Sequence, residues 1–71
     1  MDTIRTGREV MIEYTNWRGV RRERIIQPLR IWFGTSLYHK GTDWFLHAID
    51  IEKEDVRDFR MADIHSFILL E

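Results

Sequence analysis

Residues 44–61, WFLHAIDIEKEDVRDFRM, carry the strongest secondary-structure signal in the chain. The first part, Trp44–Ile51, is rich in aromatic and β-branched residues, which favour β-strands. Glu52–Asp55 is polar and predicts a hairpin loop, and Val56–Met61 predicts the strand that returns beside the first. This segment therefore predicts an antiparallel β-hairpin.

The rest of the chain repeats the same pattern of short strands between turns. Alternating apolar residues predict a strand over Val10–Thr15, and Asn16–Gly19 predicts the tight turn after it. We expect Pro28, which has no backbone N–H, to end or bend the following strand. Further extended pieces are expected at Val20–Gln27, Leu29–Phe33, Leu37–His39 and Ser66–Leu70, with one helical turn at Ala62–Ile64.

Five or six short strands and no long helix indicate an all-β fold, a small antiparallel barrel or sandwich. The periodicity alone does not distinguish an SH3-like barrel from an OB-like one. A short N-terminal helix over Thr3–Met11 is an alternative for the start, although Gly7 disfavours it. The length of 71 residues predicts a single domain over residues 1–71.

Composition excludes several classes of protein. The sequence has no cysteine, which excludes disulfides and thiolate metal sites, and we expect a cytoplasmic location. No apolar run approaches the roughly 20 residues of a membrane-spanning helix, so no membrane partner is expected. The formal net charge is −1, so the overall charge indicates no particular partner.

The distribution of charge is less even than its sum. Basic side chains gather early and acidic ones later: Arg18, Arg21, Arg22, Arg24 and Arg30, then Glu52, Glu54, Asp55, Asp58 and Asp63. One interpretation is a local basic face that binds an anion. The other is a solvated strand that forms salt bridges with the acidic half.

Four segments occur in an order and spacing that resemble a known family: Ile12–Tyr14 with the Gly-containing turn after it, Arg24–Leu29, Trp44–Leu46 followed by Ala48 and Asp50, and Val56–Ile64. In this order they are similar to the first hairpin, the arginine-to-proline segment, the Trp-Tyr-Leu motif and the closing arginine motif of the WYL domain of bacterial transcription regulators. The resemblance covers most of the chain.

This resemblance implies an Sm-like, SH3-type barrel and a ligand-sensing or regulatory role, often beside a helix-turn-helix domain. Single-stranded nucleic acids are among the ligands proposed for the family. The chain has no helix-turn-helix segment of its own, so we do not expect it to read duplex DNA by itself. At two positions it departs from the family: Phe45 replaces the tyrosine, and Asp63 stands where a basic residue is usual. Both changes make the site less polar or less positive.

Arginine and aromatic side chains indicate a site for a small anion or a single-stranded nucleic acid, because guanidinium groups match phosphate oxygens and rings stack on bases. A regular strand places Arg57 and Arg60 on opposite faces, so they converge only if a bulge or the barrel end reorients one of them. The alternative is ion pairing, of Arg57 or Arg60 with Asp50, Glu52 or Asp55, and of Arg22 or Arg24 with Glu13 or Glu23. The candidate ligand-binding residues are Arg57, Arg60, Arg22, Arg24, Tyr14, His39 and Phe45.

The aromatic residues also suggest an alternative function. Neighbouring strand residues point to opposite faces, so Trp44 and Phe45 cannot fill the same core, and we expect one of them to be partly exposed or to meet a partner. Trp17, in the predicted turn, and Trp32 are candidates for an interface. Together with the departures at Phe45 and Asp63, they favour a protein–protein interaction module that has lost ligand binding.

No motif predicts catalysis or a cofactor. The histidines are widely spaced, and a zinc site usually has close ligand pairs. The sequence has neither a Gly-x-Ser-x-Gly nucleophile motif nor a Gly-rich phosphate loop. We therefore expect a non-enzymatic ligand-sensing domain of a transcription-related protein, with no metal.

Overall fold

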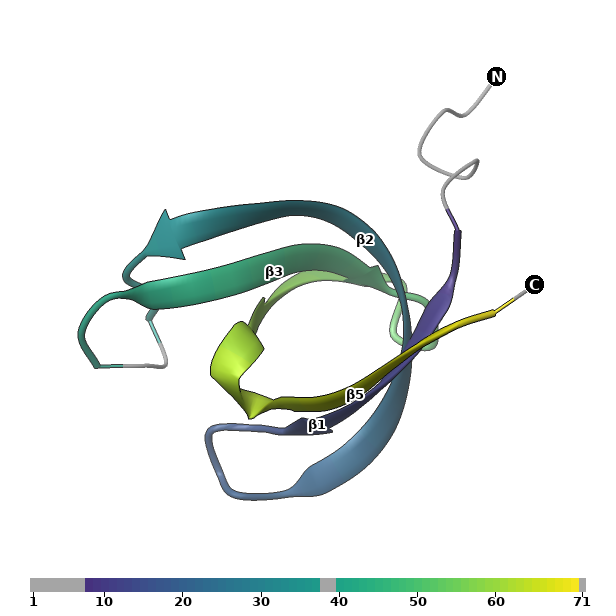
Figure 1. The fold of residues 1–71 in the computed structure, drawn as a ribbon, viewed down its shortest axis with the longest axis horizontal. Coiled ribbons are helices and arrows are strands. Elements are labelled where there is room, and N and C mark those ends of the chain that lie inside the picture. The colour runs from purple at the N-terminus through teal and green to yellow at the C-terminus, as the bar shows by residue number, and fades with distance from the viewer. Residues whose placement is uncertain (1–7, 38–39, 71) are drawn as a thin grey trace.

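The computed structural model describes residues 8–37 and 40–70. These residues form β-structure with one short 3-10 turn. The elements are β1 (Val10–Thr15), β2 (Arg21–Gly34), β3 (Asp43–Asp50), β4 (Asp55–Arg60), η2 (Met61–Asp63) and β5 (Ile64–Leu69). All neighbouring strands are antiparallel, in one sheet of order β4-β3-β2-β1-β5 (Figure 1). The predicted all-β antiparallel fold is confirmed.

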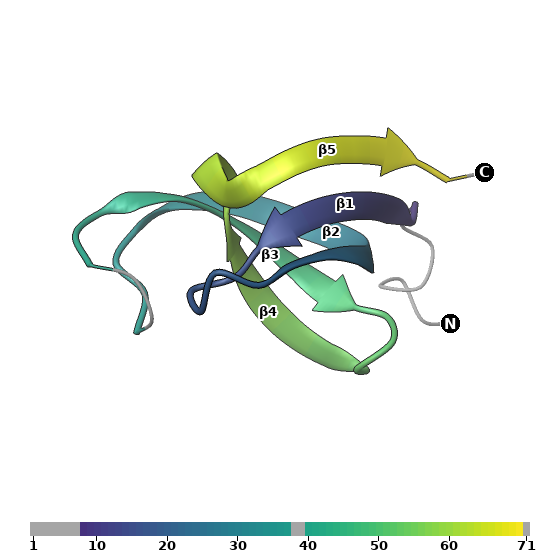
Figure 2. The same cartoon turned by 90° about the horizontal axis from the view of Figure 1, so that it is seen from below.

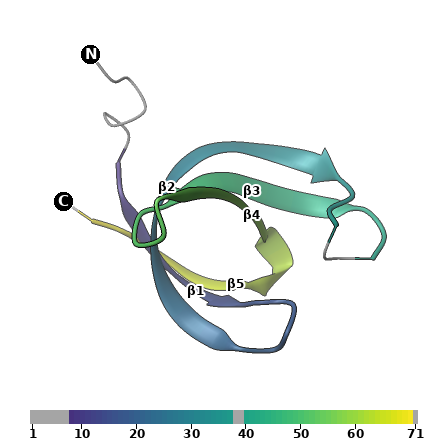
Figure 3. The same cartoon turned by 180° about the vertical axis from the view of Figure 1, so that it is seen from behind.

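The sheet curls strongly around its inner face, as Figures 1 and 3 show from opposite sides. The 14-residue β2 makes this possible because its first half pairs with β1 and its second half with β3. The two border strands, β4 and β5, are joined by η2, but no ladder links them within the described residues. Closure into a barrel is therefore not shown by the strand pairing and stays a prediction.

Pro28 bends its strand without ending it. The sequence predicted separate extended pieces before and after this residue, whereas the structure has one continuous β2. The register with β3 shifts between Pro28 and Arg30, which lie opposite Ala48 and His47. The shift is a β-bulge in which Leu29 is the extra residue. The bulge accommodates the absence of a backbone N–H at Pro28 and increases the local twist.

Two other predicted segments differ from the structure. The alternative N-terminal helix is wrong over its described part, because residues 8 and 9 have no regular structure and residues 10 and 11 belong to β1. In the predicted strand Leu37–His39, Leu37 lies in a turn, and the other two residues fall outside the described part of the chain. The predicted helical turn is confirmed as η2, one residue earlier than expected.

The turn between β1 and β2 is held by the side chain of Asn16. Its Oδ1 accepts hydrogen bonds from the backbone N–H groups of Arg18 and Val20 at 2.9 and 3.0 Å. Gly19 has a φ of 83°, a conformation that costs glycine little because it has no Cβ. These two features confirm the turn predicted from the sequence and explain it.

The core lies on the inner face of the curled sheet. Alternate residues of β1 point inward, and the Tyr14 and Phe59 rings meet edge to face with centroids 4.9 Å apart. Ile64, just after η2, packs against this cluster. The buried members are Val10, Ile12, Tyr14, Ile26, Leu46, Ala48 and Phe59.

An ion pair is buried beside this apolar cluster. Arg24 Nη1 on β2 donates to Asp50 Oδ2 on β3 at 3.0 Å, and the two side chains are only 8% and 2% exposed. Asp50 Oδ1 also accepts the Lys53 backbone N–H, at 3.3 Å, at the start of the following hairpin. A charge in such a place requires its partner, because an unpaired buried charge is strongly destabilising. This pair therefore joins β2 to the end of β3.

Replacing Asp50 with alanine would leave the Arg24 guanidinium buried without its carboxylate. We expect the free energy of unfolding to fall by about 3–5 kcal/mol. Urea denaturation followed by tryptophan emission measures this change, and a variant already unfolded without urea would also meet the expectation. Glu13→Ala is the matched control, since it removes the exposed carboxylate that pairs with Arg21 at 3.0 Å. Equal stability losses in the two variants would contradict a structural role for the buried pair.

Candidate ligand-binding site

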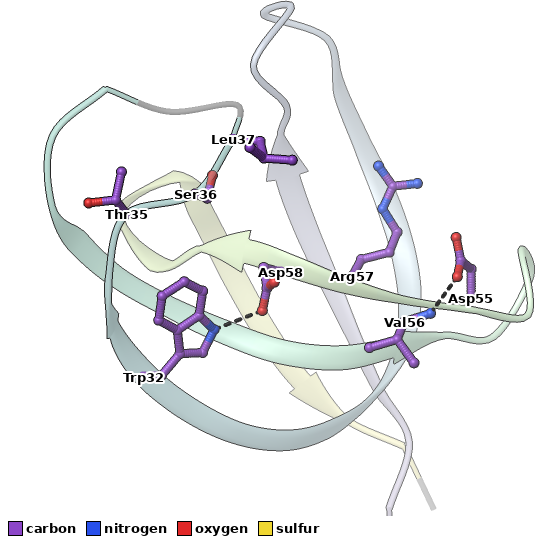
Figure 4. A pocket seen from close by; sticks show the side chains of 8 residues that line it. All are labelled: Trp32, Thr35, Ser36, Leu37, Asp55, Val56, Arg57 and Asp58. Carbon is purple, nitrogen blue, oxygen red and sulfur yellow. Dashed lines mark hydrogen bonds between the residues drawn. The ribbon is translucent and has the colours of Figure 1, made fainter.

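A pocket of about 510 Å³ lies between β4 and the segment that follows β2 (Figure 4). This volume falls within the range of small-molecule sites. The wall combines one indole ring with polar, aliphatic and charged side chains from two distant parts of the chain. Its lining residues are Trp32, Thr35, Ser36, Leu37, Asp55, Val56, Arg57 and Asp58.

The indole wall of the pocket is held in place by Asp58. The Trp32 Nε1–H donates to Asp58 Oδ1 at 2.7 Å, and the indole stacks on Phe45 with ring centroids 4.8 Å apart. His47 Nδ1 lies 2.8 Å from the same oxygen. Because an ionised carboxylate only accepts hydrogen bonds, Nδ1 carries the proton in this arrangement. One carboxylate on β4 thus positions rings from β2 and β3.

Arg57 connects this pocket with a smaller cavity. Its side chain is half-buried and lines both spaces. Among residues 8–37 and 40–70 it forms no ion pair, and Asp50, one of its predicted partners, pairs with Arg24 instead. The Arg57 guanidinium therefore keeps its donors available for an anion.

The smaller cavity has a volume of about 30 Å³, enough for a group the size of a water molecule or a single oxygen substituent. Arg24 also contributes to its wall, and Arg24 Nε is buried without a hydrogen-bond partner in the described part of the chain. The lining residues are Tyr14, Asn16, Trp17, Arg24, Arg57, Asp58 and Phe59. Two guanidinium groups at one small cavity can hold an oxygen of a phosphate or carboxylate.

Arg60 lies on the other face of β4, as the odd spacing from Arg57 predicted. It lies opposite Phe45 in the ladder, whereas Arg57 lies opposite Ala48. Arg60 Nε donates to Asp43 Oδ2 at 2.7 Å, and Nη1 lies 3.5 Å from Asp63 Oδ2. The hydrogen bond to Asp43 raises the pKa of Arg60. Arg60 is thus engaged within the fold.

Two of the aromatic residues that were predicted to contact a ligand are buried. Tyr14 is 5% exposed and Phe45 is fully covered, whereas Trp44 is 53% exposed, so the expected division between Trp44 and Phe45 is confirmed. The Tyr14 hydroxyl accepts the backbone N–H of Arg60 at 2.9 Å, and burial raises its pKa. Arg22 is exposed opposite Tyr14 on β2. His39 lies outside the described residues.

The structure therefore unites part of the predicted set. Arg57, Arg24 and Tyr14 share the small cavity, while Arg60 and Phe45 lie on the other face of their strands. Sequence reasoning missed Asp58, which is 26 residues from the Trp32 that it binds. The only local signal was strand alternation, which places Asp58 and its neighbour Arg57 on opposite faces of β4.

The fold and the arginine-lined cavity define a small β-sheet domain with an anion-compatible site. The chain matches the WYL domain family over residues 1–69, and it belongs to that family. Among solved structures it is similar to the proteasome accessory factor B/C (PafBC) of Arthrobacter aurescens, with 28% sequence identity and a TM-score of 0.67 over 93% of this chain. The match covers 10% of the PafBC chain. No curated protein sequence matches.

These comparisons confirm the resemblance seen in the sequence motifs and support a regulatory domain of a bacterial transcription-related protein. In the part of the chain that the structure describes, no helix is long and apolar enough to cross a membrane. The same residues contain no group of three side chains that could hold a metal ion.

Replacing Asp58 with alanine should release the Trp32 indole. We expect the indole Nε1–H resonance of Trp32 to shift in a ¹H–¹⁵N NMR spectrum, while the other two tryptophans of the sequence stay in place. The free energy of unfolding should fall by about 1.5–3 kcal/mol, because the hydrogen bonds from Trp32 and His47 to a charged group are removed. Asp55→Ala is the control, since Asp55 lines the same pocket but accepts only from the neighbouring Val56 N–H in the described structure. An unmoved Trp32 resonance in Asp58→Ala would show that Asp58 does not position the ring.

Proposed function

We propose that this WYL domain is a non-catalytic sensor in a bacterial transcription-related protein and that it binds a phosphate-bearing ligand. A nucleotide-like anion or a short single-stranded nucleic acid fits this description. The observation that carries the proposal is the Arg57 side chain, which is half-buried, has no acidic partner in the described residues and shares a small cavity with Arg24. The absence of cysteine is consistent with a cytoplasmic location.

The electrostatics favour a compact anionic group. An arginine presents its N–H donors as a planar fork that matches two phosphate oxygens. Asp50 neutralises Arg24, so Arg57 is the cation of the cavity lining that forms no ion pair within the described residues. Asp55 and Asp58 line the adjoining pocket and disfavour a ligand with charge spread over a wide surface. Asp58 also lines the small cavity, whereas Asp55 does not, so a single phosphate held by Arg57 meets one of these carboxylates instead of both.

Trp17 supports a ligand that carries a base. It is 59% exposed at the β1–β2 turn, and the Arg18 guanidinium carbon lies 5.4 Å from the centroid of its ring. Trp17 also lines the small cavity with Arg57 and Arg24. Exposed rings beside basic side chains are the usual means of binding single strands, because every base has a face that can stack. The indole could stack a base while Arg57 holds the adjacent phosphate.

Replacing Arg57 with alanine should weaken the binding of a short single-stranded oligonucleotide by roughly 10- to 100-fold, because one charge-assisted hydrogen-bonding group is removed. Fluorescence anisotropy of labelled oligonucleotides at roughly 50 and 200 mM salt measures the change in affinity. The slope of log K against log salt should become shallower by about 0.7 for each phosphate that the variant no longer binds. Nucleotides are titrated in parallel.

Arg30→Ala is the control for the removal of one positive charge. Arg30 is exposed on β2 and lies outside the pocket and cavity that Arg57 lines. It should reduce affinity far less than Arg57→Ala. Equal effects of the two variants would show that binding depends on the overall positive charge and not on the position of Arg57. The absence of saturable binding by the folded wild-type chain would refute the proposed function.

Replacing Trp17 with alanine should weaken oligonucleotide binding by about 1–3 kcal/mol, the usual contribution of one stacked base. The same change should have little effect on a ligand without a base, such as inorganic pyrophosphate. Trp44→Ala is the matched control, because Trp44 is 53% exposed and lies outside both spaces that Arg57 lines. If Trp44→Ala lowers the affinity as much as Trp17→Ala does, stacking on Trp17 is not the cause.

A further inference from the structure

A second surface, distinct from the arginine cavity, is almost purely apolar. A groove of about 460 Å³ lies on the inner side of the sheet, where β2 faces η2 and β5. Arg30 is the one charged residue in its described lining, and Leu46 and Ile64 connect the groove floor to the core. Its lining residues are Pro28, Leu29, Arg30, Ile31, Leu46, Met61, Ile64 and Phe67.

The apolar surface continues beyond the groove in both directions. The β2–β3 hairpin projects past η2 as an arm (Figure 1), and Phe33 and Trp44 pair on the face that carries Ile31, with ring centroids 5.1 Å apart. At the other end, Leu69 follows Phe67 on β5. We call this surface the apolar strip; its exposed members are Leu29, Ile31, Phe33, Trp44, Met61, Phe67 and Leu69.

The strip is large for a chain of this size. Phe33, Trp44 and Phe67 are each 53–56% exposed, which corresponds to roughly 300 Å² of aromatic surface. The four aliphatic members add roughly 200 Å². A total of roughly 500 Å² lies in the upper range of the largest patch on a typical monomer and generally marks an interaction site.

This area matches one side of a homodimer interface. A standard interface buries about 800 Å² per partner, and homodimer interfaces are about 65% apolar, so each copy needs roughly 500 Å² of apolar surface. The formal net charge of −1 gives two copies little mutual repulsion. Arg30 is the one charged residue in the described lining of the groove, and charged residues are similarly depleted at the centre of protein–protein interfaces.

The border strand beside the strip, β5, is also open to pairing with a strand of another chain. β5 has no strand on its outer side among the described residues, and Figure 2 shows it at one border of the sheet. Its sequence, Ile64–Leu69, contains no lysine, acid or proline, the residues that usually keep edge strands apart. Its outer backbone groups can pair with a strand of another chain.

We propose that a second copy of this chain covers the apolar strip in a two-fold symmetric dimer. In such a dimer the same patch is used by both copies, so each strip meets an equally apolar partner and the β5 edges lie at the border of the contact. Ile31 on the strip and Trp32 at the ligand pocket are neighbours on β2 and point to opposite faces. The apolar strip shares no residue with the lining of the arginine cavity, so the dimer leaves that cavity open, and this inference does not rest on the proposed ligand.

Sedimentation equilibrium of the wild-type chain from roughly 1 µM to 1 mM tests the proposal, with a reversible dimer in the micromolar range expected for an interface of this size. Ile31→Glu and Phe67→Glu, made separately, should each weaken dimerisation by roughly 10-fold or more, because a carboxylate would be buried at the contact. Val20→Glu is the control; Val20 is 46% exposed at the β1–β2 turn and lies outside the strip. It should leave the dimer unchanged.

Circular dichroism checks that each variant is folded. If one strip variant does not fold, the other still tests the proposal. Hydrogen exchange of the wild-type chain needs no substitution: β5 amides should become more protected as the protein concentration rises. A wild-type chain that stays monomeric up to roughly 1 mM would overturn the proposal. So would a dimer that both strip variants leave intact, since another surface would then hold it together.

Discussion

Every strand of the described sheet takes its position from β2. β1 and β3 pair with it directly, β5 pairs through β1 and β4 through β3. A single straight strand could not serve both halves of a sheet that curls around a core, so the bulge at Pro28 and Leu29 is the constraint on which the fold depends. Before the bulge β2 covers the core, and after it the strand extends into the arm.

The surroundings of each arginine determine its role. Arg24 is buried against Asp50, and Arg60 is held by Asp43 and Asp63, so both stabilise the sheet. The Asp63 that departs from the family pattern is thereby a partner of Arg60. Arg57 has no such carboxylate among the described residues, which is why it is the centre of the proposed ligand site. Counting arginines along the chain therefore overestimates the charge available to a ligand.

Alternation along β2 separates two surfaces on one strand. Trp32 is fixed by Asp58 at the ligand pocket, while Ile31 faces the apolar strip on the other side. The proposed ligand site and the apolar strip therefore lie on different surfaces, and the strip contains neither Trp17 nor Trp32, the interface candidates of the sequence. The two proposals together predict that a ligand at Arg57 and a second copy at the strip occupy separate surfaces.

The sequence by itself determined most of the strands, the Asn16–Gly19 turn, the family and the opposite placement of Arg57 and Arg60, because these follow from local pattern and spacing. It could not show that β2 runs through Pro28, since a proline stops one strand and bends another according to the tertiary contacts around it. Only the tertiary structure decided that Arg24 binds Asp50 and that Asp58 binds Trp32. Each of these pairs is 26 residues apart, and strand register, not local sequence, sets which side chains meet across a sheet.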